Sequence, residues 1–384
     1  MDFELGETER LLAEAARRLS AKEIEPVLAA HPPDRPLPKA AMLELYRSVA
    51  ELGFHGARVP EAEGGSGLSY VMLGVLYETL PPVLTMSLLG HEATIKRIHM
   101  GASPAVRERF LPALLAGRRI AATAASEPNV GSDPRSIETT ATLDGDEYVL
   151  NGAKLWTSNG QIVDVALVIA SLGRDRAGRN LITGILVDRA ESPFESHEVP
   201  VVGLQQGHLA ELHFRDCRVP KAHALGEPGH AHAALTFTWL ASRANIGLVA
   251  VHLAQRALER SVAYARERVQ FGKAIGSFQL VQAMLAEMAT LTEASRLLCY
   301  RALALLDRGV WCHRESSMAK AYATEAAVKV TNLAIQLHGA YGLTKEFPLE
   351  GWARDARMLT IPDGTTQIHQ LIIGRELLGL RAFS

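Results

Sequence analysis

The sequence contains little cysteine and has no excess of charge of either sign. Only three cysteines occur among 384 residues, and none belongs to a C-x-x-C pair. This excludes a disulfide framework and a zinc ribbon, and it predicts a reducing, cytoplasmic compartment. The 40 Lys and Arg against 42 Asp and Glu leave a net charge of -2. A dedicated nucleic-acid binder would carry a basic face, so that class is excluded as well.

Long apolar runs and metal-ligand clusters are also missing. The first ten residues, MDFELGETER, are acidic and polar where a signal peptide would be basic and then apolar. No run approaches the ~18 uninterrupted apolar residues of a membrane span, so none is predicted. His230 and His232 form an H-x-H pair with no matching partner, and we expect no metal site.

Three well-known catalytic or nucleotide-binding signatures do not occur. There is no G-x-x-x-x-G-K-[ST] phosphate loop, no G-x-G-x-x-G opening a helix after a strand, and no G-x-S-x-G nucleophile elbow. What is present is ordinary for a soluble globular protein: 48% hydrophobic and 21% charged residues, in a chain long enough to bury a large core.

The periodicity changes twice along the chain, which predicts an α+β protein of three units at 1–120, 121–232 and 233–384. The first third has helical spacing over 9–24, 39–52, 70–80 and two segments within 84–119, and Pro26 is expected to end the first helix. From about 120 to 230 the runs are short and β-branched, with a hairpin at Asp144-Gly145. Long helices then cover about 233–268, 278–306, 313–338 and 365–380.

Four segments contain residues suited to binding or catalysis, and each also has a purely structural interpretation. The turn S-E-P-N-V-G-S-D at 126–133 offers backbone N–H groups to an anion, or it is a capping loop. In L-W-T-S-N-G at 155–160, Trp156 is either a core residue or a face for a flat ligand. The turn R-E-R-V-Q-F-G-K at 266–273 neutralises a helix end or binds phosphate. P-D-G-T-T-Q at 362–367 opens the last helix, where Asp or Thr is a usual N-cap.

Taken together and in this order, the motifs resemble the acyl-CoA dehydrogenase family over the whole chain. The matching patterns are S-E-P-x-x-G-S-D, N-G-x-K-x-W-x-S-N-G, R-x-x-F-G-K, Gln336-Leu-His-Gly-Ala340 with Gly342, Arg354-Asp355, and D-G-T-T-Q followed by Leu371-Ile-Ile-Gly-Arg375. The resemblance implies an N-terminal helical domain, a central β-barrel and a C-terminal four-helix domain. It also implies FAD as cofactor, which this family binds without a Rossmann motif.

The resemblance assigns cofactor roles residue by residue. Ser126 would hydrogen-bond the flavin ring, Trp156 would pack beside the isoalloxazine, and Ser158 would face its N5 edge. The positions that would hold the FAD of a neighbouring subunit are Arg268, Phe271, Gln279, Gln336 and Gly339. Thr365 and Gln367 would lie near the ADP half, where a helix N-terminus favours phosphate. A site shared between subunits implies a homo-oligomer, with a tetramer as the expected form.

The family reaction needs a base for a proton α to a thioester carbonyl, donors for the enolate, and flavin N5 to take the β-hydride. Asp363 occupies the position where the family commonly has Glu, and at the alternative base position Ser242 cannot serve. Asp is shorter than Glu by one C–C bond, ~1.5 Å, so either the acyl group sits deeper or differently, or Asp363 is only an N-cap. The helix terminus would lower its pKa and a dry site would raise it.

Substrate identity is less constrained. Ser132, Arg243 and Gly364 are the candidate contacts to the thioester. Leu240 replaces a frequent family Asp near the pantetheine arm, which leaves room for an acyl-carrier-protein substrate. The polar segment 91–99 lies where relatives line the acyl cavity. We expect a solvated helix face there, or alternatively a short, polar or alicyclic acyl group.

The leading hypothesis is therefore an FAD-dependent dehydrogenase of an acyl thioester that passes electrons to an electron-transfer flavoprotein. Two alternatives remain open at this point: a flavin oxidase of the nitroalkane-oxidase type, and a non-catalytic relative that binds flavin or CoA. The working direction of the reaction is open too, since a low-potential donor would run it as a reductase.

Overall fold

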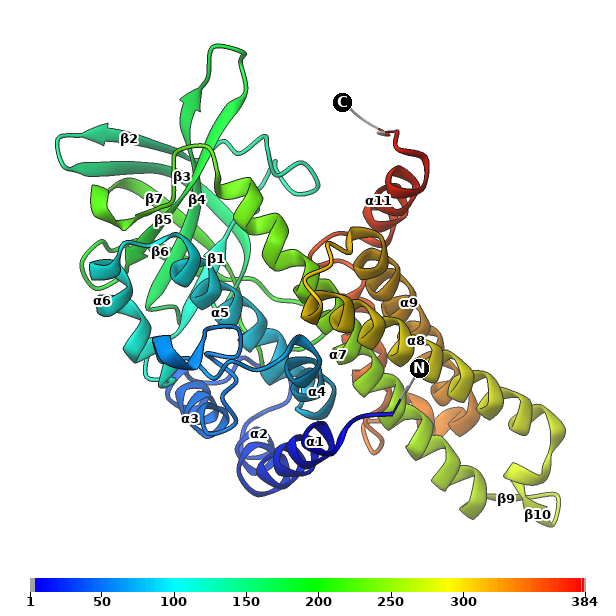
Figure 1. Cartoon of the computed structure of the whole chain (residues 1–384). Helices are drawn as coiled ribbons and strands as arrows, with labels where there is room; N and C mark the ends of the chain where they lie inside the picture. Colours follow the sequence, from blue (N-terminus) through cyan, green and yellow to red (C-terminus); the bar gives the residue numbers. More distant parts are fainter. Residues whose placement is uncertain (1–3, 381, 383–384) are drawn as a thin grey trace.

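The chain is divided in space as it is along the sequence, with helices, then a sheet, then helices (Figure 1). The computed structural model describes residues 4–380 and 382. The N-terminal helices are α1 (Glu7–Leu19), α2 (Glu25–Ala29), α3 (Lys39–Ala50), α4 (Tyr70–Thr79), α5 (Pro82–Gly101) and α6 (Pro104–Leu115). Ser69 and Ser103 cap α4 and α6 by accepting hydrogen bonds from backbone N–H groups three residues later.

The first predicted helix continues past the expected stop. Pro26 does not end it, because a π-helical turn (Ser20–Ile24) joins α1 to α2 and places Pro26 in the first turn of α2. A proline is tolerated there, since the N–H groups of a first turn have no partner inside their own helix.

The central domain is one eight-stranded sheet. Its strands are β1 (Ala121–Ala124), β2 (Thr140–Asp144), β3 (Glu147–Ser158), β4 (Val165–Arg174), β5 (Asn180–Asp188), β6 (Glu195–Glu198), β7 (Leu209–Pro220) and β8 (Ala224–Leu225). The order is β6-β7-β3-β2-β4-β5-β8, and β1 pairs with β4 in parallel. The hairpin predicted at Asp144-Gly145 is confirmed, since Asp144 pairs with Glu147 across β2 and β3.

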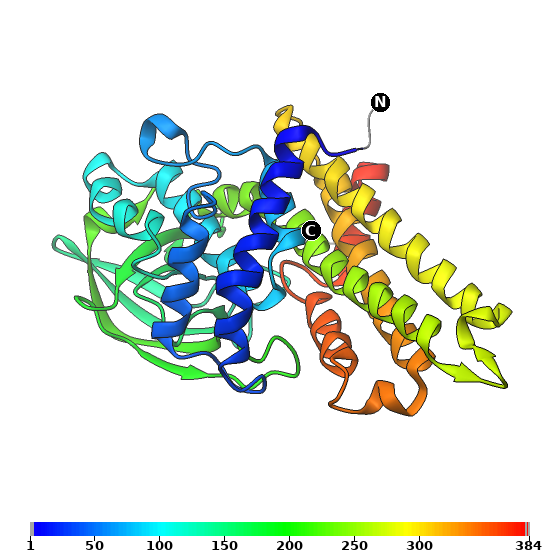
Figure 2. The same cartoon turned by 90° about the horizontal axis from the view of Figure 1, so that it is seen from below.

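The C-terminal helices pack around α9, which contacts α7, α8, α10 and α11 (Figure 2). They are α7 (Ala231–Glu267), α8 (Gln279–Asp307), α9 (His313–His338), α10 (Leu349–Leu359) and α11 (Thr366–Leu378), with a short hairpin of β9 (Val269–Gln270) and β10 (Lys273–Ala274) before α8. Helix α10 was not predicted from the sequence. By length and composition α7 could cross a membrane, but 78% of its most apolar window is buried inside the fold, as in a core helix.

The polar segment of α5 is not a solvated helix face, and that expectation is wrong. His91, Glu92, Thr94 and Arg97 are all buried. Helix α5 packs against α7 on one side and β1 on the other, so polar residues on either side are enclosed. His91 shows how they are satisfied: its Nδ1 accepts a hydrogen bond from the Ala121 N–H (2.9 Å), and its Nε2 donates to the Leu114 carbonyl (3.2 Å).

Asn159 joins the sheet to the N-terminal helices. Its amide nitrogen donates to Tyr46 Oη (3.1 Å) and to the Ser87 carbonyl (2.9 Å), and its amide oxygen accepts from Ser87 Oγ (2.6 Å). The side chain is fully buried, and its backbone has a left-handed φ of 63°. Asparagine is one of the few non-glycine residues that tolerate this conformation, so one residue supplies both the turn and the link.

We expect Asn159→Ala to lower the apparent Tm by about 3 °C or more, because buried Ser87 and Tyr46 groups lose partners and alanine is strained at this φ. Asn159→Gly loses the same hydrogen bonds without the strain and should fall between the wild type and Asn159→Ala. Thermal unfolding with excess FAD measures both. Asn332→Ala is the control, since the exposed Asn332 bonds only a carbonyl of its own helix. Equal Tm values for all four proteins would contradict the proposed link.

Candidate active site

Two of the motifs identified in the sequence are tied together by a buried ion pair. Lys154 Nζ lies 2.6 Å from Glu127 Oε1 and also donates to the Ala125 carbonyl (3.2 Å). Glu127 in turn accepts from the backbone N–H groups of Glu138 (2.7 Å) and Thr139 (2.9 Å). Burial alone would raise the pKa of Glu127, but the hydrogen bonds from Lys154 and Thr139 outweigh it and hold that pKa below its ordinary value. The pair therefore fixes the loop at 126–133 against β3.

Trp156 is not a core residue, so that structural interpretation is wrong. It sits at a register shift of β3 against β7, with φ of 63°, and 54% of it is exposed. Ser158 follows Trp156 by two residues, and the Ser126 carbonyl accepts from the Leu155 N–H (2.9 Å), which brings Ser126 beside β3; both serines are half-buried. An exposed indole on a bulge, flanked by hydroxyls, suits a flat heteroaromatic ring. The residues present thus fit a flavin, while their individual contacts remain a prediction.

The loop before α11 holds the proposed base in an unusual backbone conformation. Asp363 has φ of 53° and Gly364 has φ of 105°. A Cβ at residue 364 would lie only 3.1 Å from His369 Cε1, so glycine is needed here for two reasons. The N-cap of α11 is Thr365, whose Oγ1 accepts from the Ile368 N–H (3.3 Å). The N-cap alternative for Asp363 is therefore wrong, and its side chain is left for another purpose.

The Asp363 carboxylate is half-buried and accepts no hydrogen bond from any residue that the structure describes. Burial raises its pKa above the usual 3.8, while Arg97, Arg243 and Lys320 oppose that rise by their positive charge. A carboxylate with a raised pKa and free lone pairs is suited to accept a proton.

Two of these cations also hold the loop. Lys320, fully buried in α9, donates to the carbonyls of Thr360 (2.8 Å) and Gly364 (2.7 Å). Arg243 on α7 donates through Nε to the Asp363 carbonyl (3.4 Å), and its Nη1 has no partner among the described residues. Burial lowers the pKa of Lys320 to about 7, partly offset by Asp363. The backbone of the base is thus held from α7 and α9 while its carboxylate stays unbonded.

The other substrate-side residues lie in the loop between β1 and β2 and in the first half of α7. Ser132 is exposed, and the neighbouring Asp133 lies close enough to His232 to influence its pKa. Ser242 is buried, and its hydroxyl donates to the Thr238 carbonyl (3.1 Å), consistent with its exclusion as base. Leu240 is fully buried.

The remaining predicted cofactor residues lie at the far end of the C-terminal helices, remote from the sheet in both views (Figures 1 and 2). They are all exposed: Arg268, Phe271, Gln279, Gln336 and Gly339. Tyr264 near the end of α7 stacks on His338 at the end of α9, with ring centroids 4.2 Å apart. The five residues thus gather at one end of the bundle, but not with Ser126 or Trp156 of the same chain.

Sequence reasoning missed Arg97 and Lys320. Arg97 lies within the polar segment that was noticed but expected to face solvent. Lys320 stands in M-A-K-A-Y-A, where Ala319 and Ala323 are buried. A lone cation among apolar residues was the available signal for Lys320, whereas nothing in the polar segment distinguished Arg97.

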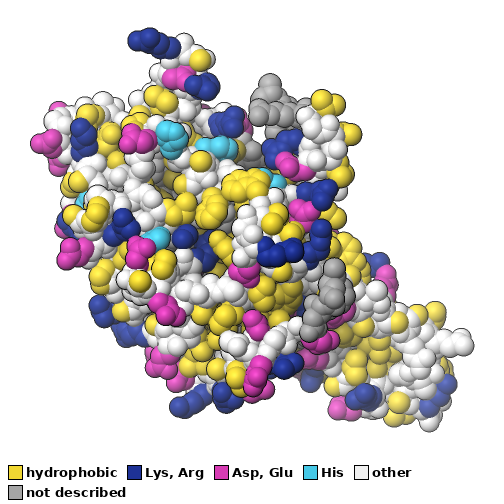
Figure 3. All heavy atoms as spheres, viewed as in Figure 1, with side chains coloured by type: hydrophobic (Ala, Val, Ile, Leu, Met, Phe, Trp, Pro, Cys, Tyr) yellow, Lys and Arg dark blue, Asp and Glu magenta, His cyan; other side chains and the backbone are white. Residues whose placement is uncertain are grey.

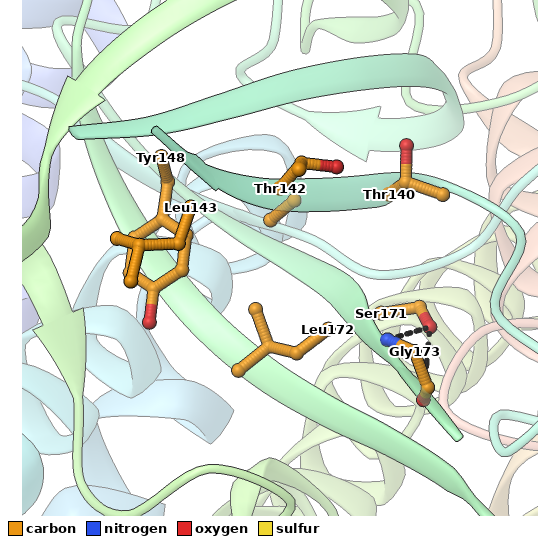
Figure 4. Close-up of a pocket in the computed structure, with 8 residues that line it drawn as sticks. Thr140, Thr142, Leu143, Tyr148, Ser171, Leu172 and Gly173 are labelled. Atoms are coloured by element: carbon orange, nitrogen blue, oxygen red, sulfur yellow. Dashed lines mark hydrogen bonds between the residues drawn. The ribbon is translucent and has the colours of Figure 1, made fainter. Parts of the chain in front are cut away.

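A separate cavity of about 340 Å³ lies in the sheet domain, where Leu143, Leu172 and Tyr148 point toward one another beside Thr140 and Ser171 (Figure 4). It holds no carboxylate, amine or imidazole, so it offers no group for proton abstraction. No group of three or more His, Cys, Asp or Glu suited to a metal occurs in residues 4–380 and 382.

Comparison with known proteins shows the family of the chain. Three domain descriptions match the chain in order: acyl-CoA dehydrogenase N-terminal domain at 6–118, middle domain at 122–217 and C-terminal domain at 232–378. The chain belongs to the acyl-CoA dehydrogenase family. The enzyme is accordingly an FAD-dependent oxidoreductase that acts on CH–CH donors.

Individual relatives cover nearly the whole enzyme. Acryloyl-CoA reductase (NADH) of Anaerotignum propionicum is 37% identical, over 98% of this chain and 96% of its own. Butyryl-CoA dehydrogenase of Megasphaera elsdenii superposes with a TM-score of 0.92 at 29% identity, covering 98% of this chain and 100% of its own. A chain solved in work on the electron transferring flavoprotein of Acidaminococcus fermentans gives a TM-score of 0.91 at 30% identity, with coverage of 98% and 100%.

The buried ion pair yields a first prediction for the site. Glu127→Gln leaves the Lys154 ammonium buried without a counter-charge, and we expect a loss of about 3–5 kcal/mol of stability together with weaker FAD retention. The double variant Glu127→Gln/Lys154→Met removes both charges and should recover part of the loss. Apparent Tm and the Kd for FAD measure this. A single variant as stable as the wild type would contradict the role assigned to the pair.

The charges around the loop before α11 yield a second prediction for the site. Lys320→Met removes a positive charge near Asp363, so the pKa of Asp363 should rise further and the acid limb of the flavin-reduction rate should move to higher pH. Below its own pKa of about 7 Lys320 is charged in the wild type, so the difference falls on that limb. Lys329→Met, an exposed lysine on the same helix, is the control. An acid limb at unchanged pH would contradict this assignment.

Proposed function

We propose that Asp363 removes the proton α to the carbonyl of an acyl thioester, so that a hydride leaves Cβ and an α,β-unsaturated thioester forms. Bound FAD supplies the hydride acceptor at flavin N5. The observation that carries the proposal is the Asp363 carboxylate itself, which is half-buried, unbonded to described residues and raised in pKa. General-base catalysis of this kind contributes about 10²–10⁴-fold to a rate.

The same surroundings favour the negative charge that develops on the substrate. An enolate forming beside Asp363 would be stabilised by the buried positive charge of Arg243, because a low dielectric strengthens that attraction. We assign Arg243, Ser132 and Gly364 to thioester binding. The conformation of Gly364 leaves its side unobstructed by a Cβ.

The cofactor would be held in two halves. Ser126 and Ser158 would bind the edge of the flavin and Trp156 its ring. Thr365 and Gln367 would lie near the ADP half, where the free N–H groups at the start of α11 attract phosphate.

A second subunit would complete the site. The five residues predicted to hold the FAD of a neighbour are Arg268, Phe271, Gln279, Gln336 and Gly339. They lie at or beside the ends of α7, α8 and α9 and the β9–β10 hairpin, which both views place away from the sheet that carries Trp156 (Figures 1 and 2). Phe271 is 93% exposed, and hydrophobic side chains lie across the face that includes the C-terminal helices (Figure 3). Such surface is typical of an interface, and we propose a homo-oligomer, with a tetramer as the form to test.

We further propose a cytoplasmic enzyme that exchanges electrons with an electron-transfer flavoprotein and acts on a CoA or carrier-protein thioester. Three buried free thiols fit a reducing compartment. Because one relative is named an acryloyl-CoA reductase, reduction of an unsaturated thioester is the alternative direction of the reaction. The polar surroundings of Asp363 favour a short, polar or alicyclic acyl group.

The proposal predicts that Asp363→Asn retains FAD but slows anaerobic flavin bleaching by an active thioester at least about 100-fold, since the amide cannot take the proton. Asp363→Glu should keep measurable bleaching because it retains a carboxylate. Stopped-flow absorbance over a panel of straight, branched, alicyclic and carrier-bound thioesters measures the rates.

Three outcomes would overturn parts of this assignment. Unchanged bleaching in Asp363→Asn would remove Asp363 as base. Hydrogen peroxide formed without an electron acceptor would indicate a flavin oxidase. A wild-type enzyme whose flavin no thioester bleaches would indicate a non-catalytic relative.

A further inference from the structure

Arg97 is a buried cation with no carboxylate bound to it. Only 5% of the residue is exposed. Its Nη1 donates to Thr123 Oγ1 (2.7 Å) and its Nη2 to Thr238 Oγ1 (2.6 Å), both neutral hydroxyls. Its Nε has no partner among the residues that the structure describes. Buried guanidinium groups are ordinarily paired with an anion, because an uncompensated charge in a dry interior is costly.

Arg58 shows what the same group does when a carboxylate is available. Its Nε donates to Glu92 Oε1 (2.6 Å) and its Nη2 to Glu92 Oε2, a bidentate pair enclosed between α5 and the loop before α4. Glu92 is engaged by this pair, and Arg97 makes its hydrogen bonds to Thr123 and Thr238 instead. On Arg97 the matching Nε–Nη2 edge keeps one free N–H on Nε and a second N–H on Nη2. That edge is the geometry that binds a carboxylate side-on.

The charges around Asp363 do not balance within the protein. The cations Arg58, Arg97 and Arg243 face the two carboxylates of Glu92 and Asp363, and Lys320 adds further positive charge below pH 7. Asp363 influences Arg97 across space without a direct bond, and its carboxylate is assigned to proton transfer. At least one positive charge in this enclosed region is therefore left for a ligand.

We propose that Arg97, with Thr123 and Thr238 fixing its orientation, binds a carboxylate carried by the acyl group of the substrate. The enzyme would thus act on the mono-thioester of a dicarboxylic acid. The inference rests on the thioester chemistry proposed above. Arg97 contacts Thr238 on α7, five residues before Arg243, whose Nε donates to the Asp363 carbonyl. The proposal names the substrate class that the polar α5 segment selects.

The test compares two thioesters of equal chain length, an unsubstituted acyl-CoA and its ω-carboxyl analogue, over four to six carbons. In the wild type the ω-carboxyl substrate should bleach the flavin with an apparent second-order rate constant at least about 100-fold higher, because a site built for an ion pair is left unpaired by the neutral analogue. Arg97→Met should lose this preference, because the ω-carboxyl thioester loses the cation that pairs with it while the neutral thioester does not. Arg97→Lys should keep part of it.

Lys96→Met is the matched control, since it removes a positive charge from the adjacent residue, whose Nζ donates to the Arg58 carbonyl. It should retain the preference. The proposal is overturned if the wild type shows no preference, if Arg97→Met keeps it, or if Arg97→Met slows both thioesters equally, which would assign Arg97 to the flavin or to Asp363. Apparent Tm and FAD content establish that the variants are folded. If Arg97→Met is not folded, the same comparison of thioesters is made with Arg97→Lys.

Calorimetry separates this proposal from the one on which it rests. If no thioester bleaches the wild-type flavin, the dehydrogenase proposal fails, and the carboxylate site is decided by binding alone. Weaker binding of only the ω-carboxyl thioester to the FAD-loaded Arg97→Met enzyme would support the site. Equal loss for both thioesters, or no loss for either, would overturn it.

Discussion

The attraction between one half-buried carboxylate and the cations around it is the constraint on which the site depends. Asp363 is brought near Arg97 from α5, Arg243 from α7 and Lys320 from α9, so three separate helices must pack correctly before the charges meet. Burial raises the pKa of the carboxyl and the cations limit that rise. The balance leaves a carboxyl group whose pKa lies above its ordinary value, which favours proton acceptance. Lys320 contributes a second time by holding the loop through two backbone carbonyls.

On the cofactor side, buried opposite charges again hold a loop in place. Lys154 and Glu127 are buried together, and their hydrogen bonds to neighbouring backbone groups leave little freedom in the loop they join. Trp156 and Asn159 adopt left-handed backbone conformations close to that pair, as Phe271 and Asp363 do in the other two motifs. Strained residues gathered in the motifs assigned to ligands are consistent with a backbone shaped for binding and kept in place by its surroundings.

Much of the architecture follows from local patterns, and the errors are instructive. Apolar spacing predicted the long C-terminal helices, and alternation with Asp144-Gly145 predicted the β2–β3 hairpin. The helix end predicted at Pro26 was wrong because a π-helical turn joins α1 to α2 and places Pro26 in the first turn of α2. The solvated helix face predicted for residues 91–99 was also wrong. Their polarity resembles that of an exposed face, but α5 packs between β1 and α7, which encloses them. A single helix carries no information about what covers its other side.

The sequence by itself determined the family, the cofactor and the identity of the residue at the base position, because these depend on residue types at fixed spacings. Only the tertiary structure decided that Thr365 rather than Asp363 caps α11, that Trp156 is exposed, and that Arg97 is buried without an anion. These properties depend on atoms contributed by residues far apart in the chain, such as Thr123 and Thr238 around Arg97. Burial and charge pairing are set by such distant partners, so the electrostatics of the site emerge only when the helices and the sheet are packed together.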